Sequence, residues 1–460
     1  MDPDMRFRPY DVDQLQLMPP AMRDWLPDDH LAHFITDVVG EVSLSKIYAA
    51  YADDSEGGQP AYEPRMMVNL LLYAYCVGMP SSRKIEQATY DQVAFRFLSG
   101  DQHPDHDTIS EFRRRHLKAL AGLFVQVFEL CRKAGLVKLG HVSLDSTKVK
   151  ANASKHKAMS YGRMEKKAAE LQAEVDRLLC LAEETDTAED TLHGKGNRGD
   201  ELPEELRHKT SRLEKIRSAM KALESEAESE YSQKQAEYQA KKEAREKRGG
   251  AGRAPKAPSK KPEVGRQYNF TDSDSRIQPV QGGKDFVQGY SCQAAVDEKA
   301  QIIVAADVTQ DTNDKGQIAP MLEEIKANTG GQKPGKFTAD SGYFSEANVE
   351  TLQKEKIDAY IATGKQKHGE RPLPCPRGRI PKSATVKDRM ARKLRTIKGR
   401  CTYAKRKHIP EPVFGQIKEV RGFRRFSFRG QDKVQDEWDL VCLTHNLLKL
   451  FRSGWQPNPV

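Results

Sequence analysis

Residues 141–151, HVSLDSTKVKA, decide the fold of this chain. Apolar and polar residues alternate along this stretch, which is typical of a β-strand with one buried face. Asp145 lies on the side of the expected strand opposite Val142 and Leu144. The chain before this strand has the spacing of helices, and the chain after it returns to strands only after more than a hundred residues.

The downstream part alternates strands and helices. Two strands joined by a four-residue turn predict a β-hairpin, and Gly330 and Ser345 mark the end of one helix and the cap of the next. This order predicts an α/β fold, or α+β for the whole chain. The expected elements are strands at 286–297 and 301–310, a helix at 315–331, a strand and turn at 336–343, a helix at 345–356 and a strand at 358–364.

The first 135 residues are expected to be helical. Thr108 and Glu111 form a capping-box pattern in front of a single helix that Gly135 ends. Short helices with tight turns and the arginine run 113–115 suit a DNA-binding module of the helix-turn-helix kind. A plain helical bundle with a solvated arginine face fits this pattern equally well.

A long helical insertion separates the first strand from the hairpin. Apolar residues recur at alternating spacings of four and three in two segments, and the polar stretch 184–204 can turn one helix back on the other. We therefore expect a long antiparallel coiled-coil insertion that leaves through a basic linker at 241–262. The expected seam contains Met164, Ala168, Leu171, Val175, Leu178 and Ala182, facing Leu213, Ile216, Met220, Leu223 and Ala227.

These observations divide the chain into five parts. Trp438 and its apolar neighbours predict a final helix that packs in the core. The parts are a helical, candidate DNA-binding domain at 1–135; the first strand of the sheet domain at 136–155; the helical hairpin and basic linker at 156–266; the rest of the sheet domain at 267–433; and the C-terminal helix and tail at 434–460.

Composition excludes several classes of protein. The longest apolar stretches, such as Met66–Tyr75, are far shorter than the roughly 20 residues that span a bilayer. The seven cysteines include no C-x-x-C pair, so neither a disulfide framework nor a cysteine zinc site is expected. Of the net charge of +9, residues 365–433 carry +17, from 22 basic and 5 acidic residues. This basic band predicts a polyanionic partner held in one place.

Three acidic residues stand out by their positions. Asp145 lies in the first strand, Asp340 ends a later strand, and Glu411 lies inside the basic band. Pro412 fits the first position of a helix, which would make Glu411 its cap, and Lys418 follows two turns later on the same face. A divalent metal would explain a carboxylate among so many cations. A salt bridge from Glu411 to a neighbouring base explains it as well.

A second acidic group follows the hairpin. Asp307, Asp311 and Asp314 have the look of a cation loop, but the glycine and terminal glutamate of an EF-hand are missing. We expect a solvated loop that starts the next helix.

Three motif contexts carry a family resemblance: LDSTKVKANAS at 144–154, FTADSGYFSE at 337–346 and YAKRKHIPEPVFGQIKEVRGFRRF at 403–426. In text and order they resemble the catalytic blocks of bacterial insertion-sequence transposases of the DDE type. The hairpin text at 289–309 and the helical amino-terminal region resemble this superfamily too. The resemblance implies an RNase H-like mixed sheet with flanking helices, as in retroviral integrases.

The resemblance implies a role for each matching residue. Asp145, Asp340 and Glu411 would be the catalytic triad and would bind Mg²⁺, or Mn²⁺, as two ions in each active site. The family pattern Y-x2-R-x3-E-x6-K is nearly present, but four residues separate Arg406 from Glu411, so either Arg406 or Lys407 can fill the basic position. The residues expected to contact DNA are Tyr403, Arg406, Lys407, Lys418, Arg421, Arg424 and Arg425.

The expected function follows from the resemblance. The protein would bind the terminal inverted repeats of its insertion sequence, cut the DNA with metal-activated water and join the freed 3′ end to target DNA. Its partner would be double-stranded DNA, held by a homodimer or a larger assembly, with no membrane. A cytoplasmic, nucleoid-associated bacterial protein is expected. A DNA-binding protein that no longer cuts, domesticated or regulatory, and an RNase H-like nuclease without strand transfer are the alternatives.

Overall fold

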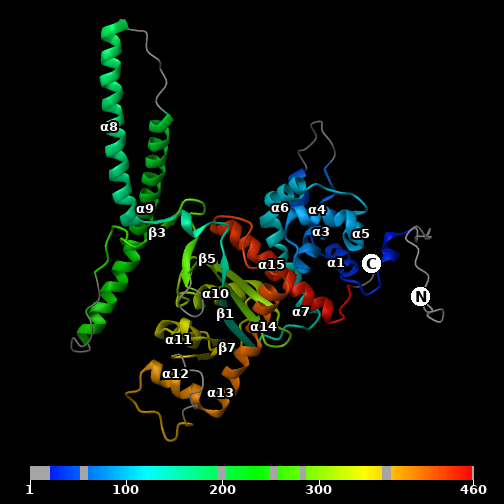
Figure 1. Cartoon of the computed structure of the whole chain (residues 1–460). Helices are drawn as coiled ribbons and strands as arrows, with labels where there is room; N and C mark the ends of the chain where they lie inside the picture. Colours follow the sequence, from blue (N-terminus) through cyan, green and yellow to red (C-terminus); the bar gives the residue numbers. More distant parts are fainter. Residues whose placement is uncertain are drawn as a thin grey trace, which may run out of the picture.

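A computed structural model of the chain describes residues 21–51, 61–193, 204–247, 254, 257–279, 286–364 and 374–457. It has a helical amino-terminal region, a central sheet flanked by helices, and a pair of long helices that project away from the sheet (Figure 1). Among the described residues, no helix is long and apolar enough to cross a membrane.

The central sheet is mixed, in the order β4–β5–β1–β7–β8, and β6 also pairs with β5. The long strand β5 pairs with β4 through its first residues and with β6 through its last ones. On its other edge it pairs antiparallel with β1, which in turn pairs in parallel with β7. The predicted α/β class with a mixed sheet is confirmed. The strands are β1 His141–Lys150, β4 Arg276–Pro279, β5 Phe286–Asp297, β6 Ile303–Thr309, β7 Lys336–Ala339 and β8 Asp358–Ile361, and a separate pair is β2 Ala158–Ser160 with β3 Gln267–Asn269.

Strand β1 changes its surroundings halfway along its length. Its first four residues, from His141 to Leu144, are buried on both faces of the sheet. From Asp145 to Lys148 the residues are only half-buried, and Val149 is buried again. Because β1 pairs with β5 across the insertion, the predicted parts 136–155 and 267–433 contribute to one sheet. The domain boundaries themselves stay predictions.

Of the two helices that follow the hairpin, α10 ends and α11 begins where the sequence predicts. The C-cap of α10 is Gly330 with φ of 67°, a left-handed conformation that glycine adopts without strain. The side chain of Ser345 accepts a hydrogen bond from the Asn348 amide at 3.1 Å and caps α11. Helices of this part are α10 Ile318–Thr329, α11 Glu346–Lys354, α12 Val386–Arg395, α13 Ile397–Ala404 and α14 Pro410–Gly415, with the 3₁₀ turns η4 Ser341–Tyr343 and η5 Lys405–His408 and the π-helical turn η6 Gln416–Val420.

The amino-terminal region is helical as predicted, but two details were wrong. Asp105, not Thr108, caps α6, because its carboxylate accepts from the Thr108 amide at 2.6 Å. The single helix expected up to Gly135 is broken at Gly122 into α6 and α7. The elements are η1 Met22–Trp25, α1 Leu31–Glu41, α2 Ser45–Tyr48, η2 Ala49–Tyr51, α3 Pro64–Cys76, α4 Ser82–Asp91, α5 Val93–Ser99, α6 His106–Ala121 and α7 Leu123–Lys133.

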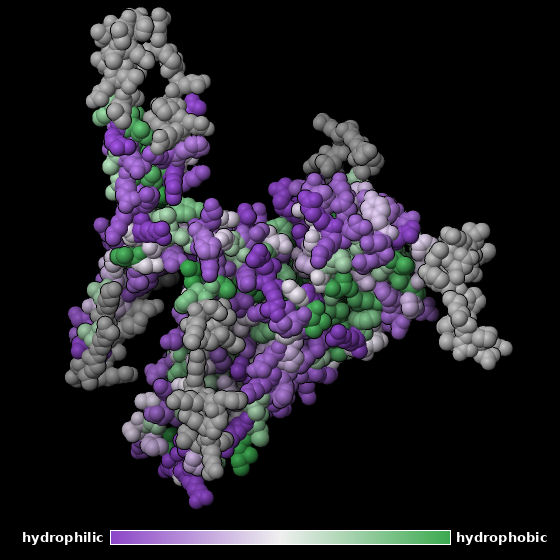
Figure 2. Space-filling view, viewed as in Figure 1, coloured by the Kyte–Doolittle hydropathy of each residue, from purple (hydrophilic) through white to green (hydrophobic). Residues whose placement is uncertain are grey.

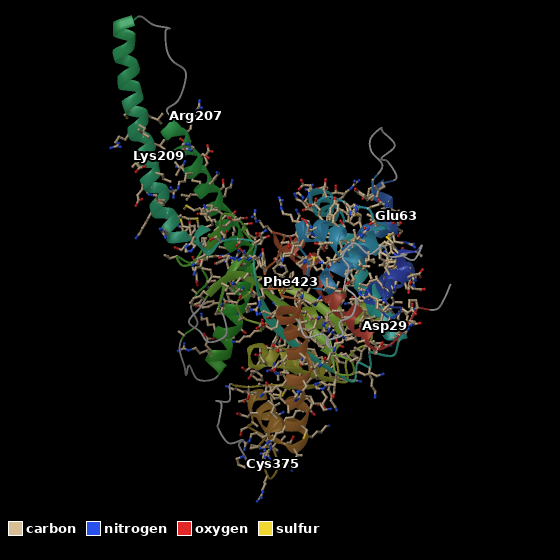
Figure 3. The ribbon with its side chains drawn as sticks, turned by 45° about the vertical axis from the view of Figure 1, so that its right-hand side comes forward. Asp29, Glu63, Arg207, Lys209, Cys375 and Phe423 are labelled. Atoms are coloured by element: carbon tan, nitrogen blue, oxygen red, sulfur yellow. The ribbon has the colours of Figure 1, made fainter. Side chains whose placement is uncertain are left out.

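The last helix, α15 Gln431–Arg452, joins the amino-terminal helices to the sheet. It contacts β6 on one side and α3, α6 and α7 on the other. Trp438 on this helix is fully buried, and its indole N–H donates to the Gln293 carbonyl at 3.0 Å, which confirms the predicted core position. Phe423 lies in the same region, between the amino-terminal helices and the sheet (Figure 3). The two regions therefore share one hydrophobic core.

The insertion forms a helical arm of two helices, α8 Tyr161–His193 and α9 Glu204–Lys247, that pack antiparallel. At one end Tyr161 donates to Glu224 at 2.5 Å, and farther along Lys209 of α9 pairs with Glu174 of α8 at 3.3 Å (Figure 3). Hydrophilic residues predominate on the described surface of the arm (Figure 2). Supercoiling stays a prediction. Of the polar stretch 184–204 expected to turn, residues 184–193 belong to α8, and of the expected linker 241–262, residues 241–247 belong to α9, so both helices run farther than predicted. The rest of the expected turn, at 194–203, and the linker residues 248–253 and 255–256 lie outside the described residues. The buried contact joins Tyr161, Met164 and Leu171 to Leu213, Ile216, Ala219 and Leu223.

Candidate active site

Asp145 is a half-buried carboxylate in the middle of β1, where the half-buried part of the strand begins. Its Oδ1 accepts a hydrogen bond from the Ser146 amide at 2.9 Å, and its Oδ2 accepts one from Arg406 at 2.8 Å. Its side chain is 17% exposed. Burial raises the pKa of Asp145 to about 6, against the opposing effect of the Arg406 guanidinium. The charges of Asp340 and Glu411 raise it further, so both carboxylates are within electrostatic reach.

Asp340 lies at the carboxyl end of the neighbouring parallel strand. The last pair in the register joins Ser143 of β1 to Thr338 of β7, so Asp145 and Asp340 each lie two residues beyond this pair. The carboxylate of Asp340 accepts from the Gly342 amide at 2.7 Å and caps the turn η4. Strand pairing thus places two carboxylates, separated by nearly two hundred residues in sequence, at one edge of the sheet.

Glu411 lies on α14, which packs beside β1. The helix begins at Pro410, so the prediction that Glu411 caps a helix starting at Pro412 was wrong: Glu411 is the second residue of the helix, in its exposed first turn. Proline fits this first turn because it lacks the amide hydrogen that the turn would leave unused. Among the described residues, no group of three or more histidine, cysteine, aspartate or glutamate side chains lies close enough to hold a metal ion. The three carboxylates therefore face one region without converging on one point.

The structure distinguishes the two candidates for the basic position. Arg406 forms the ion pair with Asp145, and Lys407 is exposed. The helix is interrupted here, because α13 ends at Ala404 and the 3₁₀ turn η5 precedes α14. Arg406 and Glu411 therefore do not lie on one continuous helix, and the helical spacing rule does not apply between them. The guanidinium also lies 5.8 Å from the centre of the Tyr403 ring, as in a cation–π contact.

Lys418 lies on the same side of β1 as Asp145. Its ammonium donates to the Thr147 hydroxyl at 2.9 Å and to the Lys148 carbonyl at 3.2 Å. Burial lowers its pKa, and the nearby Arg424 lowers it further. Arg406 and Lys418 thus place two cations on β1, at Asp145 and two residues beyond it.

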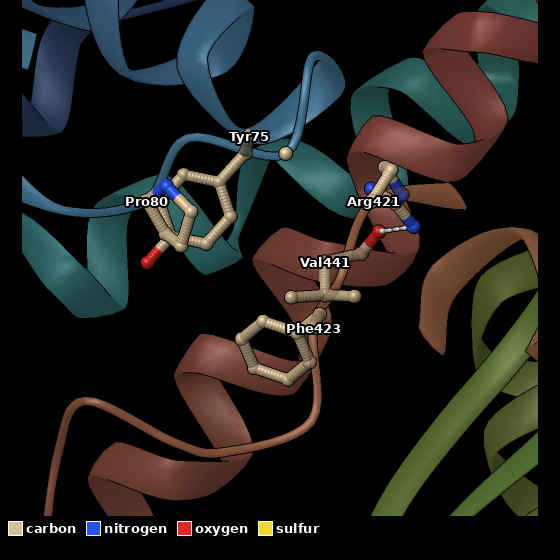
Figure 4. Close-up of a pocket in the computed structure, with 6 residues that line it drawn as sticks. Tyr75, Pro80, Arg421, Phe423 and Val441 are labelled. Atoms are coloured by element: carbon tan, nitrogen blue, oxygen red, sulfur yellow. Dashed lines mark hydrogen bonds between the residues drawn. The ribbon is translucent and has the colours of Figure 1, made fainter. Parts of the chain in front are cut away.

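The three arginines after Lys418 do not share one environment. Arg424 and Arg425 are exposed, and Arg424 pairs with Glu419. Arg421 is only 5% exposed and donates to the Thr444 hydroxyl at 2.7 Å and to the Val441 carbonyl at 3.2 Å. It lines a small internal pocket between α3 and α15 (Figure 4). The prediction that Arg421 grips phosphate is therefore corrected, because its guanidinium is committed to α15.

Sequence reasoning missed Asp314. We expected a solvated loop, but the Asp314 side chain is 17% exposed and lies against the sheet. Its carboxylate accepts hydrogen bonds from Ser146, the neighbour of Asp145, and from two residues of β5. Only a contact between distant segments reveals this position, so no local signal in the loop sequence could have found it.

Two family models match the chain. The model described as Transposase domain (DUF772) matches residues 20–115, and the model described as Transposase DDE domain matches residues 262–447. No curated protein and no solved structure matched. Together the two models cover more than half of the chain, and the chain belongs to the insertion-sequence transposases of the DDE type.

Membership of this family implies an enzyme of the nuclease and transposase class that acts on DNA. The family generally uses divalent metal ions. The DDE match contains Asp340 and Glu411 but not Asp145, which lies before the helical arm. The side chains present fit a hard divalent cation: the donors are carboxylate oxygens, and the Arg406 guanidinium already acts as a counter-cation on Asp145. The residues that would hold such an ion are Asp145, Asp340 and Glu411.

Proposed function

We propose that this transposase binds the ends of its insertion sequence, cuts the DNA there and joins the freed strand to target DNA. The proposed site is Asp145, Asp340 and Glu411 with Mg²⁺ or Mn²⁺, as two ions. The observation that carries the proposal is Asp145. It is a half-buried carboxylate on the central strand β1, beside the parallel strand β7 that Asp340 directly follows, with Arg406 as counter-cation.

When bound, a pair of divalent ions would supply an activated water and stabilise the leaving oxygen of the phosphodiester. The protein residues supply position and charge. Asp145 is held by the Ser146 amide and Arg406, so its carboxylate needs little reordering to bind a cation. Arg406 would exchange Asp145 for a phosphate oxygen once the carboxylate is neutralised, since a guanidinium binds either anion in a bidentate way.

The proposed DNA path runs from this site over the basic band. Lys418 contacts β1 beside Asp145, Tyr403 lies against Arg406, and the exposed Lys407, Arg424 and Arg425 would extend the path. Cations along a line neutralise successive phosphates and release counterions, which makes binding strongly dependent on salt. Two DNA ends must be brought together for transposition, so we propose that a homodimer or larger assembly forms on the DNA. The helical arm is available for contact between subunits or with DNA.

The test is an assay with labelled ends taken from the DNA that flanks the reading frame. The protein is incubated with these ends, Mg²⁺ and a plasmid target. Joined products support the proposal. Cleavage without joining would indicate a nuclease, and a shifted but uncut band a DNA-binding protein.

The variant Asp145→Asn should bind the ends but cut none of them. Asp311→Asn, which makes the same change on an exposed loop, is the matched control. Normal cleavage by Asp145→Asn would refute the proposed site.

A further inference from the structure

Asp314 lies in the loop between β6 and α10, yet its side chain contacts two strands of the sheet. Its Oδ1 accepts from Gln293 at 2.8 Å and from Ser291 at 3.3 Å, both on β5. Its Oδ2 accepts from Ser146 on β1 at 3.2 Å. The Lys148 ammonium lies 3.9 Å from Oδ1. One carboxylate therefore ties the loop to β1 and β5 at the level of Asp145.

The same carboxylate is connected to the turn that carries Asp340. Gln293 accepts a hydrogen bond from the hydroxyl of Tyr343, a fully buried residue of η4, three residues after Asp340. Gly342 lies between the two acids. A Cβ atom built there would be 3.0 Å from Asp340 Oδ1 and 3.5 Å from Asp314 Oδ2. Asp314 thus approaches the Asp340 turn directly and through Gln293.

A carboxylate in this place has an electrostatic cost, since Asp145 and Asp340 are also acidic. Asparagine would occupy the same volume without that charge. Its amide oxygen could accept from Gln293, and its NH₂ could donate to the Ser146 hydroxyl, since a hydroxyl both donates and accepts. What asparagine loses is the charge-assisted strength of these bonds and the attraction to the Lys148 ammonium, 3.9 Å from Oδ1. The negative charge is therefore matched to the donors around it.

We propose that Asp314 is a positioning residue of the active site, which fixes the backbone that carries Asp145 and the turn that carries Asp340 relative to each other. This inference rests on the proposed function. Asp314 acts through Ser146, Gln293 and Tyr343. Hydrogen-bond partners that orient metal ligands typically change metal affinity by about 10- to 100-fold when they are removed.

The test compares Asp314→Asn with Asp311→Asn, an equal charge change on an exposed aspartate of the same loop. Mn²⁺ binding to the whole protein is measured by titration calorimetry without DNA, beside the Mg²⁺ dependence of cleavage and thermal unfolding. We expect Asp314→Asn to bind Mn²⁺ about 10-fold or more weakly and to recover cleavage at high Mg²⁺. End binding should be unchanged, and Asp311→Asn should match the wild type. Mn²⁺ affinity of Asp314→Asn within twofold of the wild type would overturn the inference.

Two further variants keep the outcome interpretable. Ser146→Ala removes one donor to Asp314 and keeps its charge, so it should weaken Mn²⁺ binding by less than Asp314→Asn does. It also serves as the test if Asp314→Asn does not fold, and wild-type affinity in Ser146→Ala would then overturn the inference. Cleavage by Asp145→Asn would refute the proposed function, whatever Asp314→Asn does. An inactive Asp145→Asn beside a normal Asp314→Asn would refute only the role of Asp314.

Discussion

The basic band contains arginines of two kinds, and DNA binding should separate them. Arg424 and Arg425 are exposed on the stretch after the π-helical turn, whereas Arg421 is buried against α15. We expect the double variant Arg424→Ala/Arg425→Ala to lose part of the salt dependence of DNA binding. The variant Arg421→Met should keep all of it.

The expected change in the salt slope follows from the number of phosphate contacts that the double variant loses. Each phosphate contact contributes about 0.9 to the slope of log K against log salt, so two lost contacts lower the slope by about 1 to 2. The lower value applies if the Arg424 pair with Glu419 persists on DNA. Across a fourfold rise in salt, the wild type should then lose about 4- to 16-fold more affinity than the double variant.

For Arg421 the expected effect concerns folding. Burial lowers the pKa of Arg421 to about 10, a shift that corresponds to about 3 kcal/mol against the buried charge. Its two hydrogen bonds to Thr444 and Val441 contribute about 1.5 to 3 kcal/mol each and offset this cost. Methionine has a similar length without the charge, so the free energy of unfolding should change by less than about 2 kcal/mol.

Fluorescence anisotropy with a labelled end duplex, over salt concentrations from about 50 to 200 mM, measures the slopes. Urea unfolding measures the stability of the same preparations. If Arg421→Met lowered the salt slope as much as the double variant does, the buried position of Arg421 in the DNA complex would be refuted.

Three further predictions concern stability. Because the pKa of Asp145 is about 6 and its ordinary value 3.8, the folded protein holds this proton more tightly than the unfolded chain. This contribution to stability is present below about pH 4 and is lost as pH rises through 6. Asparagine does not titrate, so the free energy of unfolding of Asp145→Asn should rise relative to that of the wild type by up to about 3 kcal/mol between these pH values. Urea unfolding without metal measures this difference. Glu437→Ala should lower the free energy of unfolding in urea by about 3 kcal/mol, because this buried carboxylate accepts hydrogen bonds from two backbone amides. The exposed control Glu419→Ala should cost under about 0.5 kcal/mol. Gly78→Ala should lower stability by more than about 1 kcal/mol, since φ is 77° and a Cβ would lie 2.5 Å from a carbonyl oxygen; Gly100→Ala, also at positive φ but in open space, should cost less in thermal unfolding.

Local patterns predicted much of the fold. The alternation in β1, the hairpin of β5 and β6, and the helix ends at Gly330 and Ser345 depend on residues a few positions apart. Such signals are contained in a short window of sequence. The break at Gly122 was missed because an apolar pattern continues through it, and helix periodicity alone does not show that two helices share a face.

The candidate site was only partly accessible from sequence. The motif contexts singled out Asp145 and Asp340, and the strand register then placed them at one edge. The choice between Arg406 and Lys407 depended on the 3₁₀ turn η5, which a rule based on residue spacing does not predict. From their neighbours in sequence, Asp314 was predicted to lie in a solvated loop and Arg421 to bind DNA with the rest of a basic run. Both are determined by contacts with segments far away in sequence.

The contacts within the protein change the meaning of the +17 band. Several of its cations are already engaged within the protein: Arg406 with Asp145, Lys393 with Asp358, Lys405 with Glu298, and Arg421 with α15. An ammonium or guanidinium that is already paired with a carboxylate neutralises no phosphate, and so displaces no counterion from the DNA, unless that pair first breaks. The salt slope of DNA binding should therefore be well below the value that the charge of the band alone implies. It should rise when divalent ions neutralise the site, because Arg406 then exchanges a carboxylate for DNA.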